Sequence, residues 1–218
     1  GTAQDLPFII RGCREQGPWQ QLNNSQVDRM DNVLAAYNNK IWDVTGRGAT
    51  GVSTYDPGTG LWSLIGGSTP PFGSNYARSG CQIGNEVFMY GDGSTPGFTG
   101  LWSYNLNTNI WKQETPGGTP PGYQGIWAPA WVADPATKVC YMTGGAQTPG
   151  GGTLNSVYAY DTVQDTWLAP LRAFDSVRNY HAAFLFNRPS DNHKLLCVAG
   201  GVTTGPVLKS TQCYDFSK

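Results

Sequence analysis

The chain carries little charge and has no long apolar run, and both facts exclude classes of protein. Only 13% of its 218 residues are Asp, Glu, Lys or Arg, against about 25% in a typical soluble domain. No run of Lys or Arg occurs, so no nucleic-acid-binding surface is expected. No apolar stretch approaches the roughly 18 residues that a membrane helix needs. We therefore expect one domain, residues 1–218, that binds no nucleic acid and does not insert into membranes.

The chain also lacks the motifs of common metal and nucleotide sites. Its five cysteines show no C-x-x-C spacing, it has only two histidines, and no glycine-rich loop leads into Lys-Ser or Lys-Thr. These absences argue against a zinc site, against a copper site with several nitrogen ligands and against a P-loop. No metal and no cofactor are expected.

Glycine, proline and aromatic residues are abundant instead. The chain has 29 Gly and 15 Pro, and 12% of its residues are aromatic. Turn formers together with aromatic residues and few charges indicate an all-β fold with many tight connections. Disordered chains are poor in aromatic residues, so the composition favours a folded domain.

Tyrosine and tryptophan recur at a fixed interval. Trp62, Trp111 and Trp167 each follow a tyrosine by seven residues, whereas Tyr214 has no such tryptophan and Trp19 has no such tyrosine. Self-similarity at a period of roughly 40 to 55 residues indicates stacked supersecondary units. The predicted units are residues 23–62, 63–111, 112–167 and 168–218, the last completed by residues 8–22.

Each unit is predicted to contain four strands, a to d. Strand b is an apolar run that ends in glycine, and strand c ends in Tyr-Asp or Tyr-Asn before a tight turn into the tryptophan strand d. The four b strands are residues 40–46, 85–91, 138–144 and 194–200. Such sheets bury both faces when they stack around an axis. The sequence therefore predicts a β-propeller of four four-stranded antiparallel blades.

The last unit lacks its own strand d, and the N-terminus is predicted to supply it. Residues 17–22 contain Trp19 and would pair beside the strand that ends at Tyr214. Cys13 and Cys213 would then lie close together, and we predict a disulfide between them that locks the ring. The alternative is an arc from a larger ring, which residues 8–11 would favour if they form an extra strand c.

The glycine pairs, the Tyr-Asp turns and the following tryptophans resemble the kelch repeat over roughly residues 17–218. The closest matches are Gly144-Gly145 with Tyr160-Asp161 and Trp167, and Gly200-Gly201 with Tyr214-Asp215. The first two units depart from the pattern, because Arg47 and Asp92 separate their glycines. The resemblance implies a kelch-type propeller, although four blades are fewer than the six or seven usual in that family.

The b–c and d–a connections are long and share one face of the predicted ring. Long loops on a rigid scaffold are common binding sites, and aromatic and arginine side chains are frequent anchors. We predict a non-enzymatic recognition module that binds a protein or a glycan through this face, with packing of the loops as the alternative role for each residue. The predicted binding residues are Arg47, Phe72, Tyr76, Arg78, Asp92, Phe98, Tyr123, Trp127, Arg178 and His181.

An enzyme is the competing hypothesis. The segment around His181, with residues 194–201, is similar to part of the copper-radical oxidases galactose oxidase and glyoxal oxidase, which are built on kelch propellers. In those enzymes a histidine of this motif binds copper. A second neighbouring histidine is absent here, so His181 is interpreted as a polar residue near the axis. A hydrolase using channel carboxylates such as Asp31 or Asp43 is the other enzymatic alternative.

Two features favour a secreted or extracellular protein. Several cysteines in a chain of low charge suggest an oxidising compartment. Asn23 begins an Asn-Asn-Ser sequence that fits the N-glycosylation pattern. We therefore predict disulfides and a glycan on Asn23.

Overall fold

The computed structural model describes residues 23–25, 31–46, 51–72, 79–94, 97–205 and 207–218. All regular structure in these residues is β-strand, as the composition predicted, and no helix occurs in them. Accordingly, none of the described residues belongs to a helix that could cross a membrane.

The first two sheets are four-stranded antiparallel meanders in which neighbours in sequence are neighbours in space. The first consists of β1 (Leu34–Tyr37), β2 (Lys40–Asp43), β3 (Ser53–Asp56) and β4 (Leu61–Leu64). The second consists of β5 (Cys81–Ile83), β6 (Glu86–Tyr90), β7 (Leu101–Asn105) and β8 (Ile110–Gln113). Both sheets match the predicted a–b–c–d order.

The third sheet has the same meander and one additional strand. It consists of β11 (Ala130–Asp134), β12 (Val139–Thr143), β14 (Val157–Asp161) and β15 (Thr166–Trp167), with β9 (Gly117–Gly118) parallel to β15. β10 (Gly125–Trp127) and β13 (Ala146–Thr148) form a separate two-stranded sheet. The described residues therefore form five sheets, and the prediction of four is wrong in this respect. Two connections expected to be loops pair with each other because their extended backbones need hydrogen-bond partners.

The fourth sheet has three strands within the described residues. They are β16 (Ala182–Asn187), β17 (Lys194–Ala199) and β18 (Thr211–Asp215). The strand predicted to complete this sheet, residues 17–22, lies outside the described residues. Closure of the ring by that strand stays a prediction.

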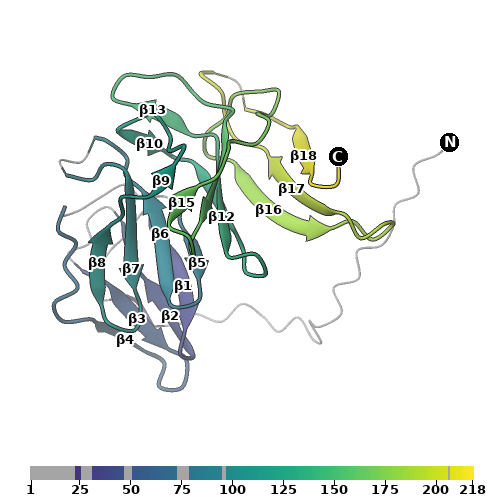
Figure 1. Ribbon diagram of the computed structural model, residues 1–218. Coiled ribbons are helices and arrows are strands. Elements are labelled where there is room, and N and C mark those ends of the chain that lie inside the picture. Colours follow the sequence, from purple (N-terminus) through teal and green to yellow (C-terminus); the bar gives the residue numbers. More distant parts are fainter. Residues whose placement is uncertain (1–22, 26–30, 47–50, 73–78, 95–96, 206) are drawn as a thin grey trace.

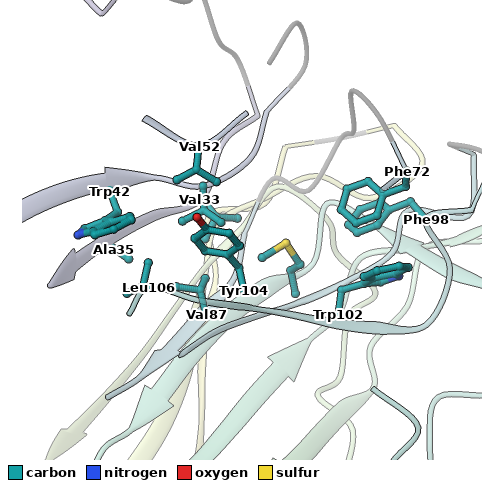
Figure 2. Close-up of a cluster of buried hydrophobic side chains, with 12 residues drawn as sticks. Val33, Ala35, Trp42, Val52, Phe72, Val87, Phe98, Trp102, Tyr104 and Leu106 are labelled. Carbon is teal, nitrogen blue, oxygen red and sulfur yellow. The ribbon is translucent and has the colours of Figure 1, made fainter. Parts of the chain in front are cut away.

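The sheets follow one another in the order of the sequence (Figure 1), and consecutive sheets share hydrophobic cores. Trp42 of the first sheet and Tyr104 of the second belong to one buried cluster (Figure 2). A second cluster joins the second and third sheets, and Trp167 is part of it. A third cluster joins the third and fourth sheets and includes Tyr141 and Leu196. The repeating unit is therefore a sheet that buries its apolar face against the next sheet.

Two disulfides correct the predicted pairing. Cys81 of β5 is bonded to Cys140 of β12, which ties the second sheet to the third. Cys197 and Cys213 lie opposite each other on β17 and β18, with 4.1 Å between their Cα atoms, and they form the second bond. The predicted Cys13–Cys213 bond is wrong because Cys213 already has a partner in the neighbouring strand. Cys13 lies outside the described residues. Two disulfides are compatible with an extracellular protein.

Candidate functional site

A pocket of about 350 Å³ lies where the first strands of all four units begin. We call it the shared pocket, and its lining residues are Asp31, Asn32, Ser79, Ala128, Pro129, Ala130, Tyr180 and His181. The segments immediately before β1, β5, β11 and β16 each contribute to this wall. The first and the last sheets therefore border the same cavity, although 148 positions separate Asn32 from Tyr180.

Hydrogen bonds between neighbouring units fix the wall of the shared pocket. The backbone N–H of Tyr180 donates to the carbonyl of Ala128 at 3.2 Å. The backbone N–H of Trp131 donates to the hydroxyl oxygen of Ser79 at 3.0 Å. Ala128 and Tyr180 both have positive φ angles, 50° and 54°, in a region that side chains other than glycine seldom adopt. The segments that begin the third and fourth units are thus each held by the unit before them.

Gly144 directly follows β12 and lets the backbone there approach Arg178 and His181 closely. Gly144 has a φ of 54°, and a Cβ atom there would lie 2.4 Å from the carbonyl oxygen of Arg178 and 2.7 Å from the ring of His181. Only glycine combines this backbone conformation with that approach. The glycine motif of the third unit therefore positions His181.

His181 is buried, with 9% of its surface exposed, and its tautomer follows from its neighbours. The hydroxyl of Thr143 donates to the carbonyl of Ala130 at 3.2 Å, so its oxygen accepts from Nε2–H of His181 at 2.8 Å. Nδ1 of His181 then carries a lone pair, and this buried atom has no hydrogen-bond partner among the residues that the structure describes. Burial and the charge of Arg178 lower the pKa of His181 to about 4. The imidazole is therefore a neutral acceptor at neutral pH.

Other polar side chains of the shared pocket also present hydrogen-bond acceptors. Asn32 donates its amide N–H to the carboxylate of Asp43 at 3.0 Å. Asp31 contributes a carboxylate, and none of the described residues that line the pocket is Lys or Arg. A ligand that donates hydrogen bonds through hydroxyl or amino groups matches this set best.

Four of the predicted binding residues are packed inside the protein. The rings of Phe72 and Phe98 lie 4.3 Å apart, and Phe72 also contacts Trp102 at 4.8 Å (Figure 2). Asp92 is buried and accepts the backbone N–H of Ser94 at 2.8 Å. The structure gives these three side chains little or no surface for a ligand. The packing role that was the alternative for each residue fits them better.

Arg178, the fourth, is fully buried and holds together the two ends of the connection between β17 and β18. Its guanidinium donates to the carbonyls of Gly200 and Ser210 at 3.0 and 3.2 Å. Burial lowers the pKa of Arg178, and the ring of Phe174 lies 5.3 Å from the guanidinium carbon. Arg178 therefore positions His181, three residues later, and does not face the shared pocket as a ligand contact.

The remaining predicted residues have mixed positions. The ring of Trp127 packs edge-on against Tyr180 at 5.0 Å, next to the shared pocket. Tyr123 is half-buried, and its carbonyl accepts the hydroxyl of Tyr90 at 2.9 Å. Arg47, Tyr76 and Arg78 lie outside the described residues.

Sequence analysis missed Asn32, Ser79 and Tyr180 as lining residues. The signal that would have found them is positional, because each residue lies two positions before the first strand of its unit, next to the position that His181 has in the fourth unit. Asn23 is exposed, and its side chain donates to the carbonyl of Gly60 at 2.7 Å. Its glycosylation stays a prediction.

Among the described residues, no group of three His, Cys, Asp or Glu side chains could hold a metal ion.

Comparisons with known proteins do not assign the chain to a family. No protein-family model matches the chain, and no curated protein matches its sequence.

Proposed function

We propose that the chain is a kelch-type propeller of four blades, completed by the N-terminal strand, that acts as a recognition module for a glycan. The four successive sheets and their shared cores support the propeller. The shared pocket supports closure, because residues ahead of the first sheet and of the last sheet line one cavity. The protein would act outside the cell, where its two disulfides are stable.

His181 carries the glycan assignment, because the residue lines the shared pocket and its buried Nδ1 has no hydrogen-bond partner among the described residues. A buried acceptor without a partner costs about 1–3 kcal/mol, and a sugar hydroxyl that donates to it would remove that cost. Asp31 and Asn32 bring further oxygen acceptors to the same cavity. Its volume of about 350 Å³ falls in the range of small-ligand sites.

The rim of the shared pocket adds an aromatic surface. Tyr180 is 48% exposed and packs against Trp127. Exposed aromatic rings combine an apolar face with a polar edge, which suits the alternating polar and apolar faces of a sugar ring. We propose that Tyr180 stacks on the ligand whose hydroxyl reaches His181.

A glycan array followed by calorimetry tests the proposal. The wild-type protein should bind at least one class of glycan, and His181→Ala should weaken that binding about tenfold or more, corresponding to the loss of about 1.4 kcal/mol. His193→Ala is the matched control, because His193 lies beyond β16 and contacts Asp191 and Ser217 instead. That variant should bind as the wild type does.

Two results would refute the assignment. One is the absence of glycan binding by a folded wild-type protein, and the other is unchanged affinity in a folded His181→Ala variant. If the chain instead captures a protein ligand, and substitution of His181 or Tyr180 leaves that binding unchanged, the binding site lies on a different surface.

A further inference from the structure

Two of the segments that line the shared pocket differ in charge. The segment before β1 contributes the carboxylate of Asp31 and the amide of Asn32, whereas the segment before β16 contributes the imidazole of His181. Asp31 is the one charged side chain among the described residues that line the pocket. The shared pocket therefore has a carboxylate side, formed by Asp31 and Asn32, and an imidazole side, formed by His181.

The imidazole side disfavours a cationic group. Burial and the charge of Arg178 lower the pKa of His181, which means that a positive charge on the ring is opposed. The same positive charge of Arg178 would oppose a cationic group that a ligand placed against the His181 ring. A group that donates to Nδ1 should therefore be uncharged, and a sugar hydroxyl meets this condition.

The carboxylate side favours a cationic group. Asn32 donates its amide N–H to the buried carboxylate of Asp43 at 3.0 Å, so the amide oxygen is the atom through which Asn32 can accept. A carboxylate has about four acceptor positions, so Asp31 can bind a ligand in addition to its contacts within the protein. Asp31 is partly buried, and salt screens a charge pair in such a position much less than one on the open surface.

We propose that the ligand of the shared pocket is an amino sugar with a free amino group, whose ammonium binds Asp31 and Asn32 while one of its hydroxyls donates to His181. This inference rests on the proposed glycan-binding function and narrows it to one class of sugar. An ammonium has three N–H donors and no acceptor, and its hydrogen bonds to a carboxylate are about twice as strong as those between neutral groups. Acetylation of the amine removes the charge and two of the donors, so the acetylated sugar should bind more weakly.

Three oligosaccharides of equal length, derived from chitosan, chitin and cellulose, test the inference. They share one backbone of linked glucose units and differ in the group at the second carbon, which is an amino, an acetylamino or a hydroxyl group. Calorimetry with the wild-type protein, slightly below neutral pH so that the amine is protonated, measures the three affinities. The chitosan oligosaccharide should bind about tenfold more tightly than either of the others, since a hydrogen bond to a charged group contributes more than one between neutral groups.

Asp31→Asn separates the two sides of the shared pocket. Residue 31 has a φ of 59°, which Asn tolerates as Asp does, so the variant should fold, and its melting temperature checks this. It should lose the preference for the amine, because Asn retains an acceptor oxygen but no charge. His181→Ala should weaken the binding of all three oligosaccharides and keep the preference. Asp175→Asn is the matched control, since it removes an exposed carboxylate outside the shared pocket, and it should also keep the preference.

Two results would overturn the inference. One is binding of the chitosan oligosaccharide that is no tighter than that of the other two, and the other is a preference for the amine that a folded Asp31→Asn variant retains. Neither result would refute the proposed function, because a glycan without an amino group could still bind through His181. The proposed function fails on different evidence, namely when the array shows no bound glycan or when His181→Ala leaves the affinity of the bound glycan unchanged.

Discussion

The third and fourth sheets follow one sequence pattern as far as the turn after strand c, and then they differ. Asp161 and Asp215 each accept the N–H of the residue two positions later, at 2.9 and 3.0 Å, so the same turn begins in both. In the third sheet the turn leads to Trp167, which is 3% exposed. In the fourth sheet the corresponding space is a cavity of about 620 Å³. Within the described residues, Trp167 fills the space beside Tyr160 in the third sheet, and no residue fills the corresponding space beside Tyr214.

Trp167→Ala should open a cavity beside Tyr160 in the third sheet. Trp167 contacts Tyr160 of its own sheet and Tyr90 of the second sheet. Its removal should lower the free energy of unfolding by about 3–5 kcal/mol. Denaturant unfolding measures this loss, and Trp62→Ala is a comparison that should cost less, because Trp62 is only half-buried. Equal losses would contradict the importance assigned to filling the interface.

The two disulfides should contribute unequally. Cys81–Cys140 spans 59 positions and joins two sheets, whereas Cys197–Cys213 spans 16 positions within one sheet. Loop-closure entropy gives about 4 kcal/mol for the first bond and about 3 kcal/mol for the second. Double Cys→Ala variants of each pair, unfolded under non-reducing conditions, should show this order. The reverse order would mean that Cys197–Cys213 stabilises the fourth sheet more than Cys81–Cys140 stabilises the interface between the second and third sheets.

Stability should fall in mild acid because of His181. Burial and Arg178 lower the pKa of His181 to about 4 in the folded protein, while an unfolded histidine has a pKa of about 6.5. Between these values the unfolded chain binds a proton that the folded protein does not, so stability is full above about pH 6.5 and falls as the pH drops toward 4, by up to about 3 kcal/mol. His181→Asn should flatten this part of the pH profile, and an unchanged slope would contradict the burial of a neutral imidazole.

The smallest expected effect concerns the ion pair that joins the third and fourth sheets. Lys194 of β17 bonds the carboxylate of Asp134 of β11 at 2.5 Å. Although burial alone would raise the pKa of Asp134, Lys194 lowers it below its ordinary value. Lys194→Met should therefore cost about 1–2 kcal/mol at neutral pH, and the cost should shrink in acid as Asp134 takes up a proton. A cost that is constant with pH would point to packing of the lysine stem instead.

Periodicity made the sheets predictable. The interval from tyrosine to tryptophan located three of the four d strands, and the apolar runs ending in glycine located every b strand, because burial on both faces demands such runs. The pairing of β10 with β13 could not be predicted, since those residues carry no strand pattern and pair only because two connections meet. The partner of Cys213 was missed because proximity was argued from the expected pairing of residues 17–22 with the last strand and not from the β17–β18 pair, in which Cys197 lies opposite Cys213.

The shared pocket was predictable only in part. His181 was noticed as one of only two histidines, but its neutral state depends on burial and on Arg178, and its tautomer depends on Thr143, which only folding brings to it. The aromatic residues Phe72 and Phe98 were expected on a binding face because their loops are long. They turned inward because those loops cap the core between the first two sheets (Figure 2). Loop length indicates where function can lie, and burial decides which side chains take part.

Nitrogen NMR of His181, recorded during titration with the glycan selected by the array, tests the central claim most directly. The account predicts a proton on Nε2 and none on Nδ1 in the free protein, and a shift of the Nδ1 signal alone when the sugar binds. A proton on Nδ1 before the titration, or sugar binding that leaves Nδ1 unchanged, would contradict it.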